Sequence, residues 1–153
     1  MAPTDFPILT EIPDSWAGKS LVSVTQITPS GFEMLVKVAQ QMRDIVKTHG
    51  GDDRLKHKVL ATTFYEASTR TSCSFQAAMM RLGGTFLHVD GQGNSSAAKK
   101  KESLEDTIRC LECYVDAVVL RHPVTGRYAV IVATTFTWFI RSTIFQLLTV
   151  VLT

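Results

Sequence analysis

Short apolar runs alternate with helical patterns through most of this 153-residue chain, and the alternation limits the folds it can adopt. The helical patterns have apolar residues three or four positions apart, and the apolar runs have the length of buried strands. Paired glycines at 50–51 and 83–84 end two of the helical patterns. The predicted order is a helix from a capping-box spacing at 30–33, a strand at 58–64, a helix at 69–82, a strand at 85–89, a helix from 103 and a strand at 117–120.

This order predicts an α/β fold. Strands that alternate with helices through short connections are typical of a parallel sheet with helices on its faces. We therefore expect three layers, with a parallel sheet between helices on both faces. Ligands of such sheets bind beyond the carboxyl ends of the strands. The residues that follow each predicted strand are therefore the first candidates for a site.

Four residues suited to an anion follow the first predicted strand: Ser68, Thr69, Arg70 and Thr71. They stand at a predicted helix start, where unpaired N–H groups and the helix dipole favour negative charge. Arginine adds a planar fork that matches phosphate oxygens. The plainer interpretation is an ordinary helix cap, because Ser and Thr are common cap residues. A second basic residue, Arg121, follows the third predicted strand at the same expected edge, which favours an anion site.

Composition excludes some classes of protein. The net charge of +2 is too small for a broad nucleic-acid surface. Residues 1–11 contain no basic stretch followed by an apolar one, so we expect no signal peptide. The three cysteines are an odd number, which favours reduced intracellular thiols. Cys110 and Cys113 form a C-x-x-C pair, but no second pair completes a zinc site, and we expect no metal.

Several separated motifs resemble one family, the aspartate and ornithine carbamoyltransferases. Residues 64–71 are similar to its carbamoyl-phosphate signature. The aspartate branch is the closer resemblance, through Ser74-Phe75, Ala78-Met79, 81–84, 96–103 and the Leu-Arg-His-Pro of 120–123. Residues 18–24 resemble the corresponding domain of the eukaryotic multifunctional pyrimidine protein. The resemblance covers residues 16–126 and implies an incomplete carbamoyl-phosphate-binding half of the transcarbamoylase fold.

The resemblance also implies roles for individual residues. Arg70 would bind the phosphate of carbamoyl phosphate, assisted by Ser68, Thr69 and Thr71. Thr71 and Arg121 would stabilise the negative charge that develops on the carbamoyl oxygen. No side chain would act as a nucleophile, because the amine of aspartate attacks directly. His122 would support Arg121.

Two more site residues lie in the loop that resembles the family's mobile loop. Ser96 would bind carbamoyl phosphate, and Lys100 would contact phosphate and the incoming aspartate. Without the surrounding motifs, the lysines at 99–101 would be read as a solvated basic loop. The family usually has glycine where this chain has Lys101, and lysine disfavours some backbone conformations that glycine adopts.

The chain divides into three expected segments: an irregular one at 1–15, a partial carbamoyl-phosphate domain at 16–126 and an apolar tail at 127–153. From Tyr128 onward the only charged residue is Arg141. Three interpretations of the tail remain open: an extension unrelated to the family, a membrane helix, or a core element. Arg141 lies near the middle of the segment, where a charge costs a membrane helix about 2.5–3.5 kcal/mol.

The resemblance therefore predicts an aspartate carbamoyltransferase of de novo pyrimidine biosynthesis. It would convert carbamoyl phosphate and L-aspartate to N-carbamoyl-L-aspartate and phosphate, without a cofactor. The family implies a cytoplasmic homotrimer with shared active sites. We expect the chain to lack the aspartate domain and to be inactive alone. The alternatives are an inactive fragment that binds carbamoyl phosphate or interferes with other subunits, and an ornithine carbamoyltransferase.

Overall fold

The computed structural model describes residues 8–91, 102–124 and 139–141. Two short 3-10 helices, η2 (Pro13–Ser15) and η3 (Val24–Gln26), precede the regular elements. The helices are α1 (Pro29–His49), α2 (Thr69–Arg81) and α4 (Leu104–Glu112), and the strands are β1 (Val59–Phe64), β2 (Thr85–Asp90), β3 (Ala117–Arg121) and β4 (Phe139–Arg141). No helix in these ranges is long and apolar enough to cross a membrane.

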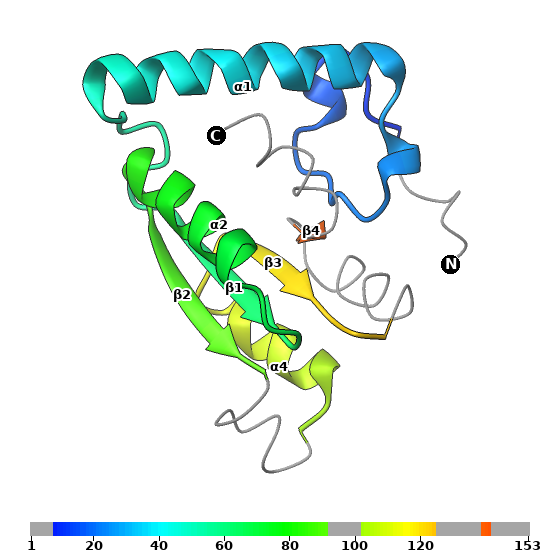
Figure 1. Ribbon diagram of the computed structural model, residues 1–153. Helices are drawn as coiled ribbons and strands as arrows, with labels where there is room; N and C mark the ends of the chain where they lie inside the picture. The colour runs from blue at the N-terminus through cyan, green and yellow to red at the C-terminus, as the bar shows by residue number, and fades with distance from the viewer. Residues whose placement is uncertain (1–7, 92–101, 125–138, 142–153) are drawn as a thin grey trace.

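The four strands form one sheet in the order β2-β1-β3-β4, and each neighbouring pair is parallel. Figure 1 shows α2 on one face of this sheet and α4 on the other. The predicted α/β fold in three layers is therefore confirmed, with strands close to their predicted bounds. The fourth strand, β4, pairs with β3 and lies within the segment that the sequence assigns to a tail.

Alternate side chains of the central strands pack on opposite faces of the sheet. Leu60 and Phe64 of β1 pack with Phe75 and Met79 of α2. Ala61 points to the opposite face, where a second buried cluster includes α4. That second cluster consists of Val22, Ala61, Leu104, Ile108, Leu111, Val115, Val118 and Leu120. A strand buried on both faces is rich in apolar residues, and β1 is apolar apart from the buried Thr62 and Thr63.

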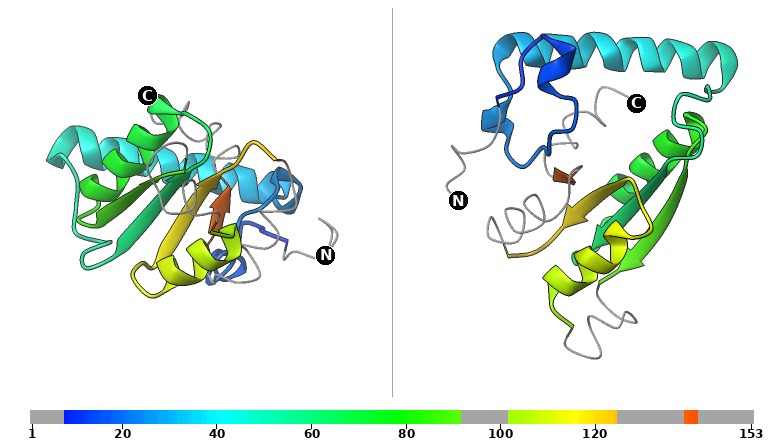
Figure 2. Two further views of the ribbon diagram at one scale, coloured as in Figure 1. Left: turned by 90° about the horizontal axis from the view of Figure 1, so that it is seen from below. Right: turned by 180° about the vertical axis from the view of Figure 1, so that it is seen from behind.

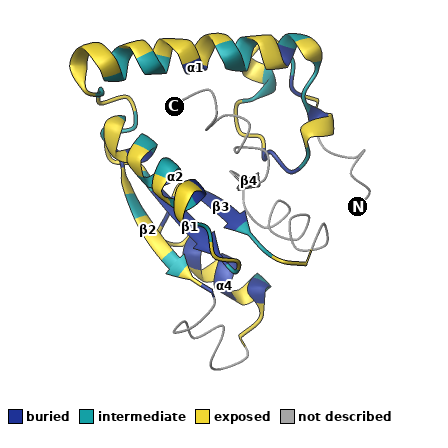
Figure 3. Ribbon diagram, viewed as in Figure 1, coloured by how far each residue is buried: buried dark blue, intermediate teal, exposed yellow. Residues whose placement is uncertain are grey.

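The long helix α1 lies apart from this layered unit, on the side where β1 and β2 begin (Figures 1 and 2). Only Gly31 and Ala39 of this helix are buried, and Phe32 remains 46% exposed. Figure 3 shows exposed and half-buried residues along α1, in contrast to the buried strands β1 and β3. The apolar stripe of α1 is therefore only partly covered.

The start of α1 differs from the sequence prediction. The N-cap is Thr28, whose hydroxyl oxygen accepts a hydrogen bond from the Gly31 N–H at 3.0 Å. The predicted capping box at Ser30 is wrong, because the helix already begins at Pro29 and the Ser30 hydroxyl donates to Glu11 instead. Proline is favoured in the first helical turn, since its missing N–H would have no partner there. The predicted end is confirmed: Gly50 closes the helix with φ of 78°.

Candidate active site

The site begins where β1 passes into α2. Ser68 is the N-cap of α2, but its side chain makes no capping hydrogen bond. Its hydroxyl oxygen instead accepts a hydrogen bond from Nη1 of Arg121, at 3.2 Å. The structure therefore connects two sequence motifs that lie 53 positions apart. The ordinary-cap interpretation of Ser68 does not account for this contact.

Arg121 is the last residue of β3 and is held from two directions. The parallel register pairs it with Phe64, so its side chain leaves the sheet at the edge where α2 begins. Its Nε donates to the Glu66 carboxylate at 3.1 Å, and its side chain is 25% exposed. The hydrogen bond and the charge of Arg121 lower the pKa of Glu66. The guanidinium is thus oriented at the carboxyl edge of the sheet before any ligand binds.

Glu66 is the partner that sequence reasoning missed. It lies inside the signature at 64–71, where it received no role of its own. One signal in the sequence points toward the ion pair: the acidic Glu66 follows the first predicted strand, and the basic Arg121 follows the third. The pairing joins positions 55 apart, and its geometry depends on the register of β1 against β3.

The first turn of α2 contains the other three predicted anion ligands. Thr69 and Arg70 are exposed, whereas Thr71 is only 3% exposed. The Thr71 carbonyl accepts a hydrogen bond from the Ser74 hydroxyl at 2.9 Å. The turn therefore presents one accessible guanidinium and one sheltered threonine at a helix N-terminus, a combination suited to an oxyanion.

Two predicted site residues, Ser96 and Lys100, lie outside the described residues. His122 follows Arg121, and its ring lies against the ring of Tyr65, with centroids 5.1 Å apart. Its Nδ1 accepts a hydrogen bond from the Val124 N–H at 3.1 Å. The predicted support of Arg121 by His122 stays a prediction.

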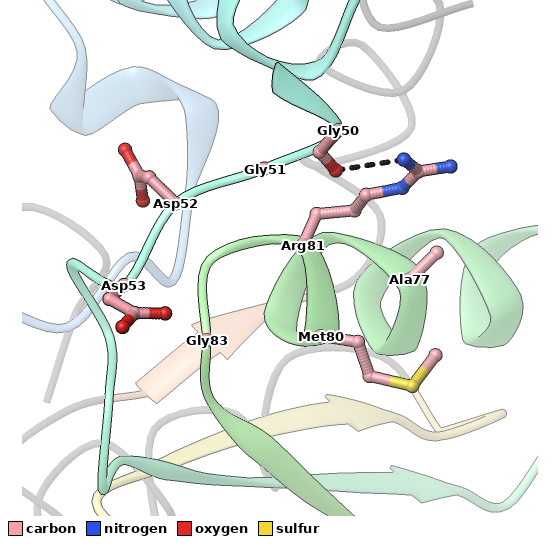
Figure 4. A pocket seen from close by; sticks show the side chains of 8 residues that line it. All are labelled: Gly50, Gly51, Asp52, Asp53, Ala77, Met80, Arg81 and Gly83. Carbon is pink, nitrogen blue, oxygen red and sulfur yellow. Dashed lines mark hydrogen bonds between the residues drawn. The ribbon is translucent and has the colours of Figure 1, made fainter.

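An open hollow of about 520 Å³ lies at the other end of the sheet, and Figure 4 shows it. Its lining comes from the segments before β1 and around the end of α2, namely Gly50, Gly51, Asp52, Asp53, Ala77, Met80, Arg81 and Gly83. The Arg81 guanidinium already donates to the Gly50 carbonyl at 2.8 Å. The carboxylates of Asp52 and Asp53 pair with Arg54 and Lys56. This hollow is separate from the edge that carries Arg121 and Ser68.

The described residues contain no group of three or more His, Cys, Asp or Glu side chains that could hold a metal ion. All three cysteines are exposed free thiols. The chemistry of the described edge is therefore that of hydroxyl groups, guanidinium groups and a helix N-terminus.

Comparisons with known proteins identify the family to which the chain is similar. A family model described as "Aspartate/ornithine carbamoyltransferase, carbamoyl-P binding domain" matches residues 19–140. The chain is 53% identical over 113 residues to the multifunctional protein pyr1-3 of Dictyostelium discoideum, covering 74% of this chain and 5% of that protein. It is 42% identical over 108 residues to the aspartate carbamoyltransferase catalytic subunit of Vibrio cholerae, covering 71% of this chain and 34% of that one.

The chain is also similar to solved structures of aspartate transcarbamoylases. The catalytic subunit of aspartate transcarbamoylase from M. jannaschii matches with a TM-score of 0.71 and 38% identity, over 80% of this chain and 39% of that chain. Aspartate transcarbamoylase from Trypanosoma cruzi, in complex with carbamoyl phosphate and aspartate, matches with a TM-score of 0.74 and 30% identity, over 82% of this chain and 41% of that chain.

The chain spans about a third of the catalytic subunit and about a twentieth of the multifunctional protein. The family match covers most of the chain and includes every element from α1 to β3, together with the first two residues of β4. The chain therefore belongs to the aspartate/ornithine carbamoyltransferase family, through the carbamoyl-phosphate binding domain.

Proposed function

We propose that this chain forms the carbamoyl-phosphate half of an aspartate carbamoyltransferase site. The reaction joins the carbamoyl group of carbamoyl phosphate to the amine of L-aspartate and releases phosphate. One observation carries the proposal: Arg121 reaches the Ser68 hydroxyl at the start of α2, so both anion-binding motifs face one edge. The aspartate branch is favoured because the Vibrio cholerae relative and both named structures are aspartate carbamoyltransferases.

Each residue has a role that its position permits. Arg70 is exposed in the first turn of α2 and would bind phosphate oxygens, with Ser68 and Thr69 beside it. Thr71 and Arg121 would donate to the carbamoyl oxygen as the aspartate amine attacks. Donors fixed before the reaction stabilise that developing charge without the cost of reorganising solvent.

Ser96 and Lys100 complete the proposed set. Ser96 would add a hydroxyl contact to carbamoyl phosphate, and Lys100 would neutralise phosphate and approach aspartate. In this family proposal the enzyme is a cytoplasmic homotrimer, and each loop carrying these residues serves a neighbouring subunit's site. The sequence assigns the domain to 16–126. Because β4 pairs with β3, we propose that the sheet of this domain includes Phe139–Arg141 as well.

Ligand protection of the purified chain tests the proposal. Carbamoyl phosphate should raise the unfolding temperature of the wild-type chain, since a ligand at a hundred times its Kd stabilises by about 2.7 kcal/mol. Arg70→Ala should lose this protection. Arg109→Ala is the matched control, because Arg109 lies on α4 and its side chain is 69% exposed. No protection of the wild type, or equal protection of both variants, would contradict the proposed site.

A further inference from the structure

Tyr65 stands where three strand ends meet. It follows β1, and its main-chain N–H donates to the Arg121 carbonyl at 2.8 Å. On the other side, the Gly91 N–H donates to the Phe64 carbonyl at 2.9 Å. The parallel pairing of β1 with both neighbours thus continues to the last residues of the strands. The main chain of Tyr65 is therefore hydrogen-bonded to the main chain of Arg121.

The ring of Tyr65 fills the space between the ends of β2 and β3. It lies against the His122 ring, with centroids 5.1 Å apart and planes inclined by 50°. A β-carbon at Gly91 would come within 2.6 Å of Cγ and 2.8 Å of Cε1 of this ring. Carbon atoms do not approach that closely without displacement, so the ring and the glycine are fitted to each other.

The hydroxyl end of Tyr65 reaches the start of α4. Burial raises the pKa of Tyr65, while the neighbouring Thr107 side chain lowers it and the charge of Glu102 raises it. Thr107 is itself buried, and its hydroxyl lies 3.1 Å from both the Glu102 carboxylate and the Ser103 carbonyl. The one side chain therefore contacts the end of β2, the end of β3 and the start of α4.

We propose that Tyr65 is a positioning residue for the carbamoyl-phosphate site, an inference that rests on the proposed function. Its ring sets the spacing between the β2 end and the β3 end, and through its main chain it fixes Arg121. The segment that begins after Gly91 is the one in which Ser96 and Lys100 occur. The planar ring is the part required, because the contacts with Gly91 and His122 are made by ring atoms.

The experiment compares variants of Tyr65, of the neighbouring Gly91 and of an exposed control tyrosine. The variants are Tyr65→Phe, Tyr65→Leu, Gly91→Ala and the control Tyr114→Leu, in which the replaced residue is 63% exposed. The Kd for carbamoyl phosphate is measured on the full chain at a temperature where each variant is folded. Tyr65→Phe should stay within about twofold of the wild type, while Tyr65→Leu and Gly91→Ala should weaken binding about tenfold. Tyr114→Leu should bind like the wild type.

A second readout reports on the ring independently of function. The proton NMR signal of the His122 ring, assigned by its loss in His122→Asn, senses the ring current of residue 65. The signal should be kept in Tyr65→Phe, displaced in Gly91→Ala and moved to a position typical of an isolated imidazole in Tyr65→Leu. An unchanged signal in both Gly91→Ala and Tyr65→Leu would overturn the inference.

The two proposals fail in different ways. If the wild type binds carbamoyl phosphate and Tyr65→Leu and Gly91→Ala bind it equally well, the positioning role is overturned and the proposed function stands. If the wild type does not bind, the proposed function fails and the positioning role fails with it, whereas the His122 signal still decides whether the ring contact exists.

Discussion

At the residue scale, two contacts of Arg121 define the candidate site. Its side chain donates to the Glu66 carboxylate and to the Ser68 hydroxyl. The sequence predicts that Ser68 and Arg121 share an edge, because both follow strands of a parallel sheet. It could not predict the ion pair of Arg121 with Glu66, because that contact depends on the pairing of Phe64 with Arg121. The burial of Thr71 could not be predicted either, since a threonine at a helix start is more often exposed.

The Arg121–Glu66 pair gives a pH dependence with a defined sign. The folded-state pKa of Glu66 lies below its ordinary value, so the pair stabilises the fold above the pKa of a free glutamate and is lost as pH falls through the lowered value. The stability difference between the wild type and Glu66→Gln should therefore be present at pH 7 and vanish in more acid solution. Salt should reduce it, because Glu66 is largely exposed.

Urea unfolding at several pH values measures this difference. Glu112→Gln is the control, since Glu112 is exposed at the end of α4. A difference between the wild type and Glu66→Gln that stays constant as pH falls would show that the ion pair contributes nothing.

At the element scale, the spacing of apolar residues predicts the order of strands and helices. It does not predict the residue at which α1 begins. The apolar runs predict β1, β2 and β3, and the Ser103-x-x-Asp106 spacing correctly predicts the start of α4, where the Ser103 oxygen accepts from the Asp106 N–H at 3.1 Å. At α1 two overlapping start signals compete. Thr28 prevails because it is followed by proline and because its N–H donates to the Leu9 carbonyl at 3.0 Å.

The competing caps can be separated by mutation. Thr28→Ala should lower the free energy of unfolding by about 1 kcal/mol, the usual cost of losing an N-cap. Ser30→Ala should cost less, because its hydroxyl bonds to side chains and not to the helix N–H groups. Urea denaturation of both variants measures the two losses in free energy of unfolding. A larger loss in Ser30→Ala than in Thr28→Ala would support the capping box that the sequence suggests.

At the scale of the whole molecule, the fold brings Ser68 and Arg121 together at the carboxyl edge of the sheet. The described edge offers hydroxyl and guanidinium groups for carbamoyl phosphate. The chain covers 34% of the aspartate carbamoyltransferase catalytic subunit of Vibrio cholerae. Orientation of the two reactants can account for roughly 7–11 kcal/mol of a barrier. A chain that orients only one of them forfeits most of that contribution.

We therefore expect the purified 153-residue chain to form no carbamoyl aspartate above the uncatalysed background. The assay mixes the chain with carbamoyl phosphate and L-aspartate and measures the product directly. Product formation above background that disappears in Lys100→Ala would contradict this expectation. Protection by carbamoyl phosphate without turnover would instead favour a binding or subunit-interfering role.

The central place of β1 has a consequence for the order in which the molecule is made. β1 leaves the ribosome before either of its neighbours, since it pairs with β2 from Thr85 onward and with β3 from Ala117 onward. Until those residues are synthesised, β1, whose last five residues are buried in the fold, has no partner strand on either side. Such non-local pairing is slow, and it leaves an aggregation-prone segment exposed until it is complete. In the nascent chain, residues 59–64 therefore lack one or both of these strand partners until residues 85–90 and 117–121 have been added.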